Sequence, residues 1–330
     1  MPLEDKIPTL PSYSIIRLYV YEMDLPNSHK AMAIDVTLDV DNPYPVGLTV
    51  PPLGFKILVD NCSRDEPFIR VANAVTQAVP VQPGHAANVS VNGLIEKLPN
   101  ALTEACPNSR DSPLDSFLGD YLHGQDATIY VQSSRLSKEV TPEWISDILS
   151  GMTIPIPFPG HSYDHLIRQF TLSDVQFELP DQTAPPDAPA AKPRVSGNVE
   201  ALVSLPEEMN LNLDVESIRA KADIYYKGKK MGILDISKWQ DAKSSAAGEN
   251  DEGKTLLIKS HIDEAPVDIT DEDVFADVLQ SLIFGDEDVL LKIKADVDVQ
   301  LQTALGQFAV KKIPAEGVIP VKRMLNLPHA

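Results

Sequence analysis

The sequence predicts a mostly β fold of two tandem β-sandwich units that each carry one amphipathic helix. The first observation is an alternation of apolar and polar residues over residues 32–41, which has the two-residue period of a strand with one buried face. The second is a local pattern that recurs at a constant offset of 161 residues, from position 118 to position 279. It matches Leu118, Tyr121, Leu122, Gly124 and Asp126 with Leu279, Leu282, Ile283, Gly285 and Glu287. A fixed internal period indicates a duplicated structural unit.

We place the first unit at residues 12–150 and the second at residues 151–330. Ile16-Arg17 near the start of the first unit resembles Ile167-Arg168 near the start of the second. The segment 180–193 is rich in Pro and Ala, as interdomain linkers are. The repeat nevertheless places this segment inside the second unit.

Strands account for most of both predicted units. In the first unit the alternating strand ends at Pro43, because proline lacks the N–H that a ladder needs, and further strands are expected at 53–59 and 71–81. In the second unit, residues 220–226 and 231–236 flank a Lys-Gly-Lys turn and predict a hairpin.

Two other stretches of the second unit have a clear character. Apolar residues alternate with Lys, Asp and Gln over residues 291–302, which predicts a long antiparallel strand with one buried side. The acidic stretch 241–253 contains Ser, Gly and Ala and predicts a mobile loop.

Three helices have recognisable ends. Ser112 is the predicted N-cap of the first helix, and Gly124 ends it. Its counterpart in the second unit ends at Gly285. A shorter helix is expected at 142–149, and one side of it carries Trp144, Ile145 and Ile148.

Composition bounds the partners and the compartment. The 330 residues hold 28 Lys and Arg against 48 Asp and Glu, a formal net charge of −20, which argues against a nucleic-acid partner. No apolar run approaches the roughly 18 residues that span a bilayer, so we expect a soluble part of a longer protein.

Cys62 and Cys106 are too few for a disulfide framework, and their pairing stays open. Asn61 and Asn88 begin N-glycosylation sequons, which matter only in a secretory or lumenal compartment.

Catalytic motifs are missing from the sequence, so we predict that the protein is not an enzyme and needs no cofactor. It has no glycine-rich phosphate loop and no Gly-x-Ser-x-Gly turn, and its cysteines lack zinc spacing. His161 and His165, with Asp164 between them, have the spacing of two metal ligands on one helix face. They follow a proline-rich turn and precede a strand, which favours a polar loop over a metal site.

Two apolar features are candidates for a ligand site. Alternating prolines in residues 154–159 predict an extended backbone outside any sheet, so its apolar side chains need another cover. That cover is either packing between the two units or contact with a lipid or membrane surface. The apolar stripes of the two long helices either line a groove for an acyl chain or make ordinary core contacts. The candidate lining residues are Phe117, Leu118, Tyr121, Leu122, Val278, Leu279, Leu282, Ile283, Ile154, Ile156 and Phe158.

Residues 36–46, Val-Thr-Leu-Asp-Val-Asp-Asn-Pro-Tyr-Pro-Val, followed by Leu-Gly-Phe-Lys-Ile at 53–57, resemble the hallmark of the type-2 late-embryogenesis-abundant domain, also called the water-stress and hypersensitive-response domain. The segments 305–308 and 313–321 resemble the closing strands of that family. The second unit lacks the asparagine of the motif at Leu205-Pro206-Glu207-Glu208, so its membership rests on the repeat.

The resemblance implies an immunoglobulin- or fibronectin-like β-sandwich with a helix and without catalytic residues. Tandem copies with acidic lumenal regions are similar to fungal vacuolar membrane proteins linked to termination of autophagy. The resemblance therefore implies a glycoprotein region in a vacuolar or lysosome-like lumen, attached to a membrane anchor outside this chain, that binds or transfers lipid. The alternative is a protein-binding scaffold or adhesion-like spacer of tandem β-sandwiches.

Overall fold

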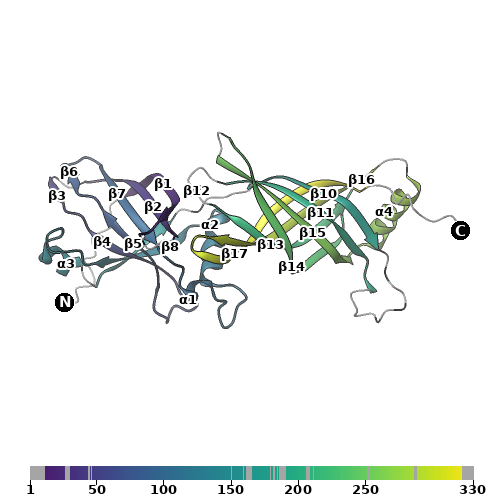
Figure 1. The fold of residues 1–330 in the computed structure, drawn as a ribbon, viewed down its shortest axis with the longest axis horizontal. Coiled ribbons are helices and arrows are strands. Elements are labelled where there is room, and N and C mark those ends of the chain that lie inside the picture. The colour runs from purple at the N-terminus through teal and green to yellow at the C-terminus, as the bar shows by residue number, and fades with distance from the viewer. Residues whose placement is uncertain are drawn as a thin grey trace.

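The chain folds as two large, mainly antiparallel β-sheets that lie end to end (Figure 1). Strands dominate and helices are few, and the two sheets are compatible with two tandem β-sandwich domains, which confirms the predicted fold class. None of the described helices is long and apolar enough to cross a membrane. The computed structural model describes residues 12–26, 30–43, 45, 47–149, 151–158, 160, 166–178, 180, 183, 185, 191–205, 209–210, 212–250, 253–285 and 288–321.

The first sheet has the strand order β12-β1-β2-β7-β5-β4-β8-β9. Its strands along the chain are β1 (Tyr13–Asp24), β2 (Lys30–Val40), β4 (Gly54–Val59), β5 (Ile69–Thr76), β7 (Ala87–Ile95), β8 (Ala127–Ser134), β9 (Thr153–Phe158) and β12 (Met209–Asn210). A separate small sheet pairs β3 (Leu48–Val50) with β6 (Val79–Val81). The strands predicted from residue 32 and from residue 53 are confirmed as β2 and β4. The single strand predicted over 71–81 is instead two strands, β5 and β6, which belong to different sheets.

The second sheet has the strand order β10-β11-β15-β14-β13-β16-β17. These strands are β10 (Ile167–Glu178), β11 (Arg194–Ser204), β13 (Asp214–Tyr226), β14 (Lys229–Asn250), β15 (Gly253–Ile269), β16 (Val289–Thr303) and β17 (Gly306–Val321). The long strand predicted at 291–302 is confirmed as β16. The proline-rich segment 180–193 stands in the sequence between β10 and β11, both strands of the second sheet, as the repeat predicts.

The two sheets share one topology. When β3, β6 and β12 are set aside and the remaining strands of each half are numbered along the chain, both sheets read 1-2-5-4-3-6-7. Both place a long helix between the fifth and sixth strands, α2 (Pro113–Leu122) in the first half and α4 (Glu272–Phe284) in the second. The repeat in the sequence is thus a repeat of topology.

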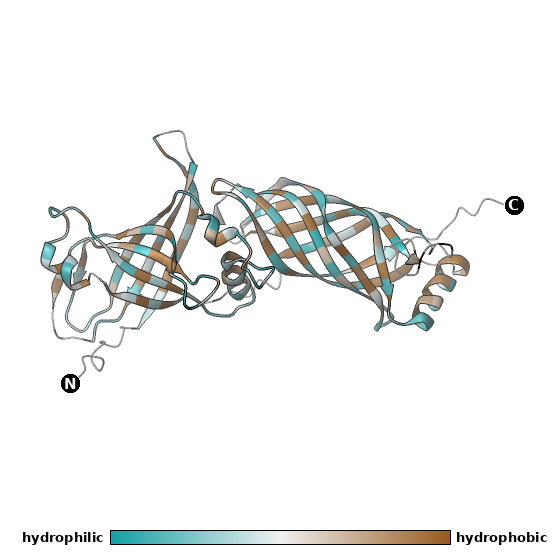
Figure 2. Cartoon of the chain, turned by 90° about the horizontal axis from the view of Figure 1, so that it is seen from below, coloured by the Kyte–Doolittle hydropathy of each residue, from teal (hydrophilic) through white to brown (hydrophobic). Residues whose placement is uncertain are grey.

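Each sheet curls until its outer strands approach each other. In the second sheet, a Cβ on Gly317 of β17 would lie 3.1 Å from the ring of Phe170 in β10, although the two strands are opposite edges. In the first sheet, the Tyr13 hydroxyl of β1 donates to the carbonyl of Pro157 in β9 at 2.6 Å. Polar and apolar residues alternate along the strands (Figure 2), so the inner face of each curled sheet forms a core.

The prediction that residues 154–159 lie outside any sheet is wrong over the described residues. Residues 153–158 form β9, and the ladder pairs Ile156 with Ile129 of β8. β9 is an edge strand, and an edge tolerates proline where the missing N–H would point to solvent, as at Pro155 and Pro157.

The change from the first sheet to the second falls between Phe158 and Ile167. The predicted boundary at 150/151 assigns β9 to the second unit, whereas its ladder with β8 places it in the first sheet.

β14 is longer than the sequence predicts. The expected hairpin is present, with Lys227 and Gly228 at φ values of 49° and 82°, as a type I′ turn requires. The stretch 241–253 is not a free loop over its described residues. It continues β14 and pairs with β15, from Ala242 opposite Ser260 to Asn250 opposite Gly253, because the ladder satisfies the backbone whatever the polarity of the side chains.

The helices begin where capping side chains satisfy free N–H groups. At α2, the Ser112 hydroxyl accepts from the Asp115 amide at 3.1 Å, while the Asp115 carboxylate accepts from the Ser112 amide at 2.7 Å. At α4, Asp271 accepts from the Val274 amide at 3.1 Å. The predicted N-cap Ser112 is therefore confirmed. The remaining helices are α1 (Asn100–Thr103) and α3 (Glu143–Leu149).

Candidate functional site

The predicted lining residues of the first unit meet at one place. Phe117 of α2 packs on the buried cluster of Val59, Ile69 and Leu102, so α2 closes one end of the first core. The Phe158 ring of β9 lies 6.1 Å from the Phe117 ring and 5.3 Å from the Tyr121 ring, measured between centroids. Tilted aromatic pairs at such distances are favourable contacts.

The exposure of these residues is mixed. Tyr121 is buried, whereas Phe117, Leu118 and the three apolar residues of β9, Ile154, Ile156 and Phe158, are half-buried. The Leu122 side chain lies outside the described part of the structure. The contact between α2 and β9 is therefore an apolar edge of the first core.

The predicted lining residues of the second unit separate. Val278 and Leu282 of α4 are buried in the largest apolar cluster, among strands β11 to β17, and Leu279 is half-buried. Ile283 is 44% exposed and faces away from that cluster. α2 lies in the middle of the molecule, where the two sheets meet, and α4 lies at the far end of the second sheet (Figure 1), so the predicted residues form no common groove.

The two sheets are joined by an apolar contact that the sequence analysis missed. The tight turn between β16 and β17 carries Leu305, which is buried against Met32 of β2 with Val20 and Ile95 around it. Leu305 thus inserts from the second unit into the end of the first. An apolar residue in a hairpin turn is the signal in the sequence that indicates such a contact.

An ion cluster lies beside this contact. The Lys311 ammonium of β17 donates to Asp115 at 2.7 Å, to Asp111 at 3.2 Å and to the Arg110 carbonyl at 2.8 Å. Burial by itself would lower the pKa of Lys311, but the hydrogen bonds and charges of Asp115 and Asp111 outweigh it and raise the pKa above the ordinary value. Lys311 therefore stays charged and holds β17 to the start of α2.

A third contact extends the first sheet with a strand from the second half. β12 pairs in parallel with β1, Met209 opposite Val20 and Asn210 opposite Tyr21. Next to it, the Glu22 carboxylate accepts two hydrogen bonds from Asn212, both at 3.2 Å. We call these three contacts, at Leu305, Lys311 and β12, the junction.

Two open clefts flank the junction, and both are lined mainly by polar residues. The first has a volume of about 330 Å³ and is lined by Tyr19, Tyr21, Glu22, Met23, Asp24, Lys30, Asn212 and Lys254. The second has a volume of about 360 Å³ and is lined by Asp111, Asp115, Ser116, Gly119, Asp120, His123, Gln125, Lys311 and Lys312. Neither lining suits an acyl chain.

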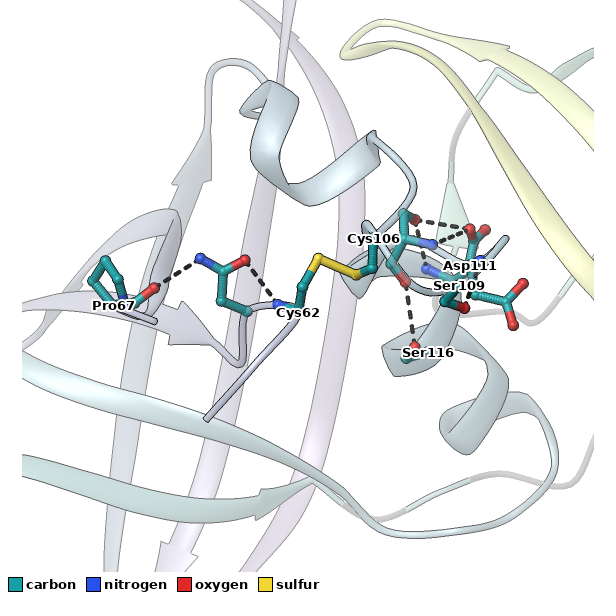
Figure 3. The surroundings of a disulfide bond; sticks show 9 residues. Cys62, Pro67, Cys106, Ser109, Asp111 and Ser116 are labelled. Atoms are coloured by element: carbon teal, nitrogen blue, oxygen red, sulfur yellow. Dashed lines mark hydrogen bonds between the residues drawn. A yellow bond between two sulfur atoms is a disulfide. The ribbon is translucent and has the colours of Figure 1, made fainter. Parts of the chain in front are cut away.

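A disulfide joins Cys62 to Cys106 and resolves the question that the sequence leaves open (Figure 3). It ties the loop between β4 and β5 to the loop between α1 and α2. The Cys106 amide also donates to the Asp111 carbonyl at 3.0 Å, so the bridge restrains the loop that supplies the partners of Lys311.

The two sequons differ in accessibility. Asn88 lies on β7 and is exposed. Asn61 is half-buried, and its carboxamide donates to the Pro67 carbonyl at 3.1 Å and accepts from the Cys62 amide at 2.8 Å (Figure 3).

Among the described residues, no group of three or more His, Cys, Asp or Glu side chains has the arrangement of a metal site. His161, Asp164 and His165 lie outside the described residues.

Comparisons with known proteins concern mainly the second unit. Residues 209–322 match the family model of the Tag1 C-terminal domain, a range that contains β13 to β17 and α4. No curated protein matches the chain.

The solved structures that resemble the chain do so only at low sequence identity and low TM-score. The chain is similar to a structure titled "Biofilm associated protein - B domain" at 8% identity, covering 95% of this chain and 86% of that chain, with a TM-score of 0.16. A second, "Biofilm associated protein - BSP domain", has 7% identity, covers 98% of this chain and 62% of that chain, and has a TM-score of 0.16.

Proposed function

We propose that the chain is a non-enzymatic scaffold that holds two β-units in one fixed orientation and presents their surfaces to protein partners. The observation that carries this proposal is the insertion of Leu305 into the end of the first unit, beside the ion cluster of Lys311. A flexible tandem needs neither contact, because a linker alone would connect the units.

The proposed setting is the lumenal side of a membrane-anchored protein that takes part in the termination of autophagy. The match to the Tag1 C-terminal domain supports this setting for the second unit. The disulfide supports an oxidising compartment, and exposed Asn88 supports a glycoprotein. A vacuolar or lysosome-like lumen and a kinship of both units with late-embryogenesis-abundant domains belong to the same proposal.

Lipid binding or transfer is the second candidate. The half-buried apolar side chains of Ile154, Ile156 and Phe158 on the edge strand β9 favour it, because an acyl chain laid along this edge would cover them. Against it stand the burial of Val278 and Leu282 in a filled core and the polar lining of both clefts at the junction.

Small-angle X-ray scattering of the dilute protein tests the scaffold. We expect the scattering of a single elongated shape, and we expect Leu305→Asp to broaden the distribution of shapes, because it places a carboxylate in an apolar contact. Val75→Asp, on an exposed strand position of the first sheet, is the control. If the unmodified protein already samples many orientations, the scaffold proposal fails.

Mass spectrometry of ligands that co-purify from a eukaryotic host tests the lipid alternative. A bound lipid that is lost in Ile156→Asp, with the melting temperature unchanged, would favour lipid binding. Lipid-free protein from the same host would reject it.

A further inference from the structure

The two units stack head to tail. The end of the first unit that carries α2 meets the β16–β17 turn of the second unit (Figures 1 and 2). This leaves one end of each kind free on the molecule. Among the described residues, the end that carries α4 on the second unit and the end that carries the β8–β9 connection with α3 on the first take no part in the junction.

The offset of 161 residues shows which surface of α4 corresponds to the surface that α2 uses at the junction. On α2, the residues Asp115, Ser116, Gly119 and His123 line the cleft shared with Lys311 of β17. Their counterparts on α4 are Ala276, Asp277, Gln280 and Phe284, and all four are exposed. The same helix face borders Lys311 of β17 in the first unit, where Asp115 and Gly119 are half-buried while Ser116 and His123 stay exposed, and it is exposed at all four positions in the second.

The open face of α4 is apolar at its end. Phe284 is 75% exposed, and Ile283 beside it is 44% exposed. Leu290, at the start of the following strand β16, is 58% exposed. Large apolar side chains that are exposed at neighbouring positions, as Ile283 and Phe284 are, are typical of an interaction surface.

The free end of the first unit carries the counterpart of the Leu305 turn. The β8–β9 connection joins the sixth and seventh strands, as the β16–β17 turn does in the second unit. Trp144 of α3 is 65% exposed there, and Val140 and Met152 of the same connection are also exposed. This connection therefore presents an unpartnered apolar residue where the second unit inserts Leu305.

We propose that copies of this chain associate head to tail, the β8–β9 connection of one copy docking on the open face of α4 in the next. The occupant is a second copy because the two kinds of end that already meet at the junction are both free on each chain. Such a contact is heterologous, so it extends to short chains of copies instead of closing as a symmetric dimer. The inference rests on the proposed scaffold function and names one of its partners.

The contact between copies differs from the junction in charge. β9 contains no lysine, so no residue of that strand corresponds to Lys311 of β17, and the association relies on apolar contact. Each copy also carries a net charge of −20, which repels the next copy at low ionic strength. We therefore expect association to increase with both protein and salt concentration.

Sedimentation velocity of the whole chain over a range of protein concentrations, at low and high salt, tests the proposal. We expect species larger than the monomer at high concentration and high salt. Phe284→Glu and Trp144→Glu should each abolish them, whereas Val75→Glu, which adds the same charge at an exposed strand position, should not. Melting temperatures equal to that of the unmodified protein show that the variants are folded.

Mixing the two variants separates a heterologous contact from a symmetric one. Phe284→Glu keeps the β8–β9 connection intact and Trp144→Glu keeps the face of α4 intact, so the mixture should form a dimer that grows no further. A protein that stays monomeric under every condition, a mixture that stays monomeric, or an effect of Val75→Glu equal to that of Phe284→Glu overturns the proposal. A monomer with a single shape in X-ray scattering would reject self-association and leave the scaffold standing.

Discussion

The two units share a strand order and differ in how they are stabilised. The second unit has long strands, such as β14 with 22 residues and β15 with 17, and one large apolar cluster into which α4 packs. In the first unit β4 has 6 residues and β5 has 8, and the buried clusters are small. That unit is reinforced by the Cys62–Cys106 disulfide and by Leu305 from its neighbour. One topology thus tolerates either a large core or external restraints.

The comparison predicts the largest effect in the core of the second unit. Leu282→Ala should lower the free energy of unfolding by about 2–5 kcal/mol, because it leaves a cavity in a packed cluster. Ile283→Ala, one residue further on the same helix and exposed, is the matched control and should change it by less than about 0.5 kcal/mol. Urea denaturation measures both. Equal, small effects would mean that the α4 stripe lines an open groove.

The disulfide should matter to the first unit alone. Cys62→Ser combined with Cys106→Ser should destabilise that unit by about 2–4 kcal/mol, because the bridge closes a loop between positions 44 residues apart and so limits the unfolded chain. Hydrogen exchange resolved by segment measures the loss in each unit. A loss of the same size in the strands of the second unit would contradict the difference between the units.

The ion cluster at the junction should have a smaller effect that depends on pH. Lys311→Met should cost about 1–2 kcal/mol at neutral pH, since Asp115 and Asp111 lose a charged donor. The pKa of Lys311 is raised in the folded protein, so its stabilisation is fully present below the ordinary lysine pKa of 10.5 and is lost as pH rises through the raised value. The unfolding free energies of variant and wild type should therefore begin to converge above about pH 10.5 and become equal once the pH exceeds the raised pKa of Lys311.

Lys312→Met is the control for that measurement. Lys312 follows Lys311 in the chain and its side chain is 66% exposed, so its replacement should hardly change the free energy of unfolding. A gap between the Lys311→Met variant and wild type that persists in strong alkali would show that Lys311 acts through packing and not through its charge.

The smallest effect on stability is expected at the sequons. Because Asn88 is exposed on β7, we expect it to carry a glycan in a secretory host. Asn88→Gln should then abolish the shift in electrophoretic mobility that treatment with a glycosidase also abolishes. Asn61→Gln should leave the shift unchanged, because the Asn61 carboxamide is engaged with Pro67 and Cys62. Protein with no glycan at Asn88 would count against a lumenal location.

Local features were predictable where the signal is local. The Ser112 cap, the Lys227-Gly228 turn and the strands β2 and β16 each depend on a few neighbouring residues. Two expectations were wrong because pairing partners outweigh composition. The proline-containing strand β9 pairs with β8, and the acidic half of β14 pairs with β15.

Less of the candidate site was predictable. The sequence identified Val278, Leu282 and Tyr121 as members of apolar helix stripes, and all three are buried. It did not distinguish a core from a groove, because periodicity shows which face of a helix is apolar and not what covers that face. The ion cluster of Lys311 could not be predicted from the sequence, since its partners Asp111 and Asp115 lie about 200 residues earlier in the chain.

The sequence by itself determined the class of fold, the duplication and the place of each long helix, because alternation, capping residues and a constant offset are properties of segments and of their order. The tertiary structure alone decided that Cys62 pairs with Cys106, that Leu305 fills the end of the first unit, and that the face of α4 with Phe284 stays open while the matching face of α2 meets β17. These are contacts between surfaces distant in the chain, and they depend on how the curled sheets stack, which no local pattern encodes.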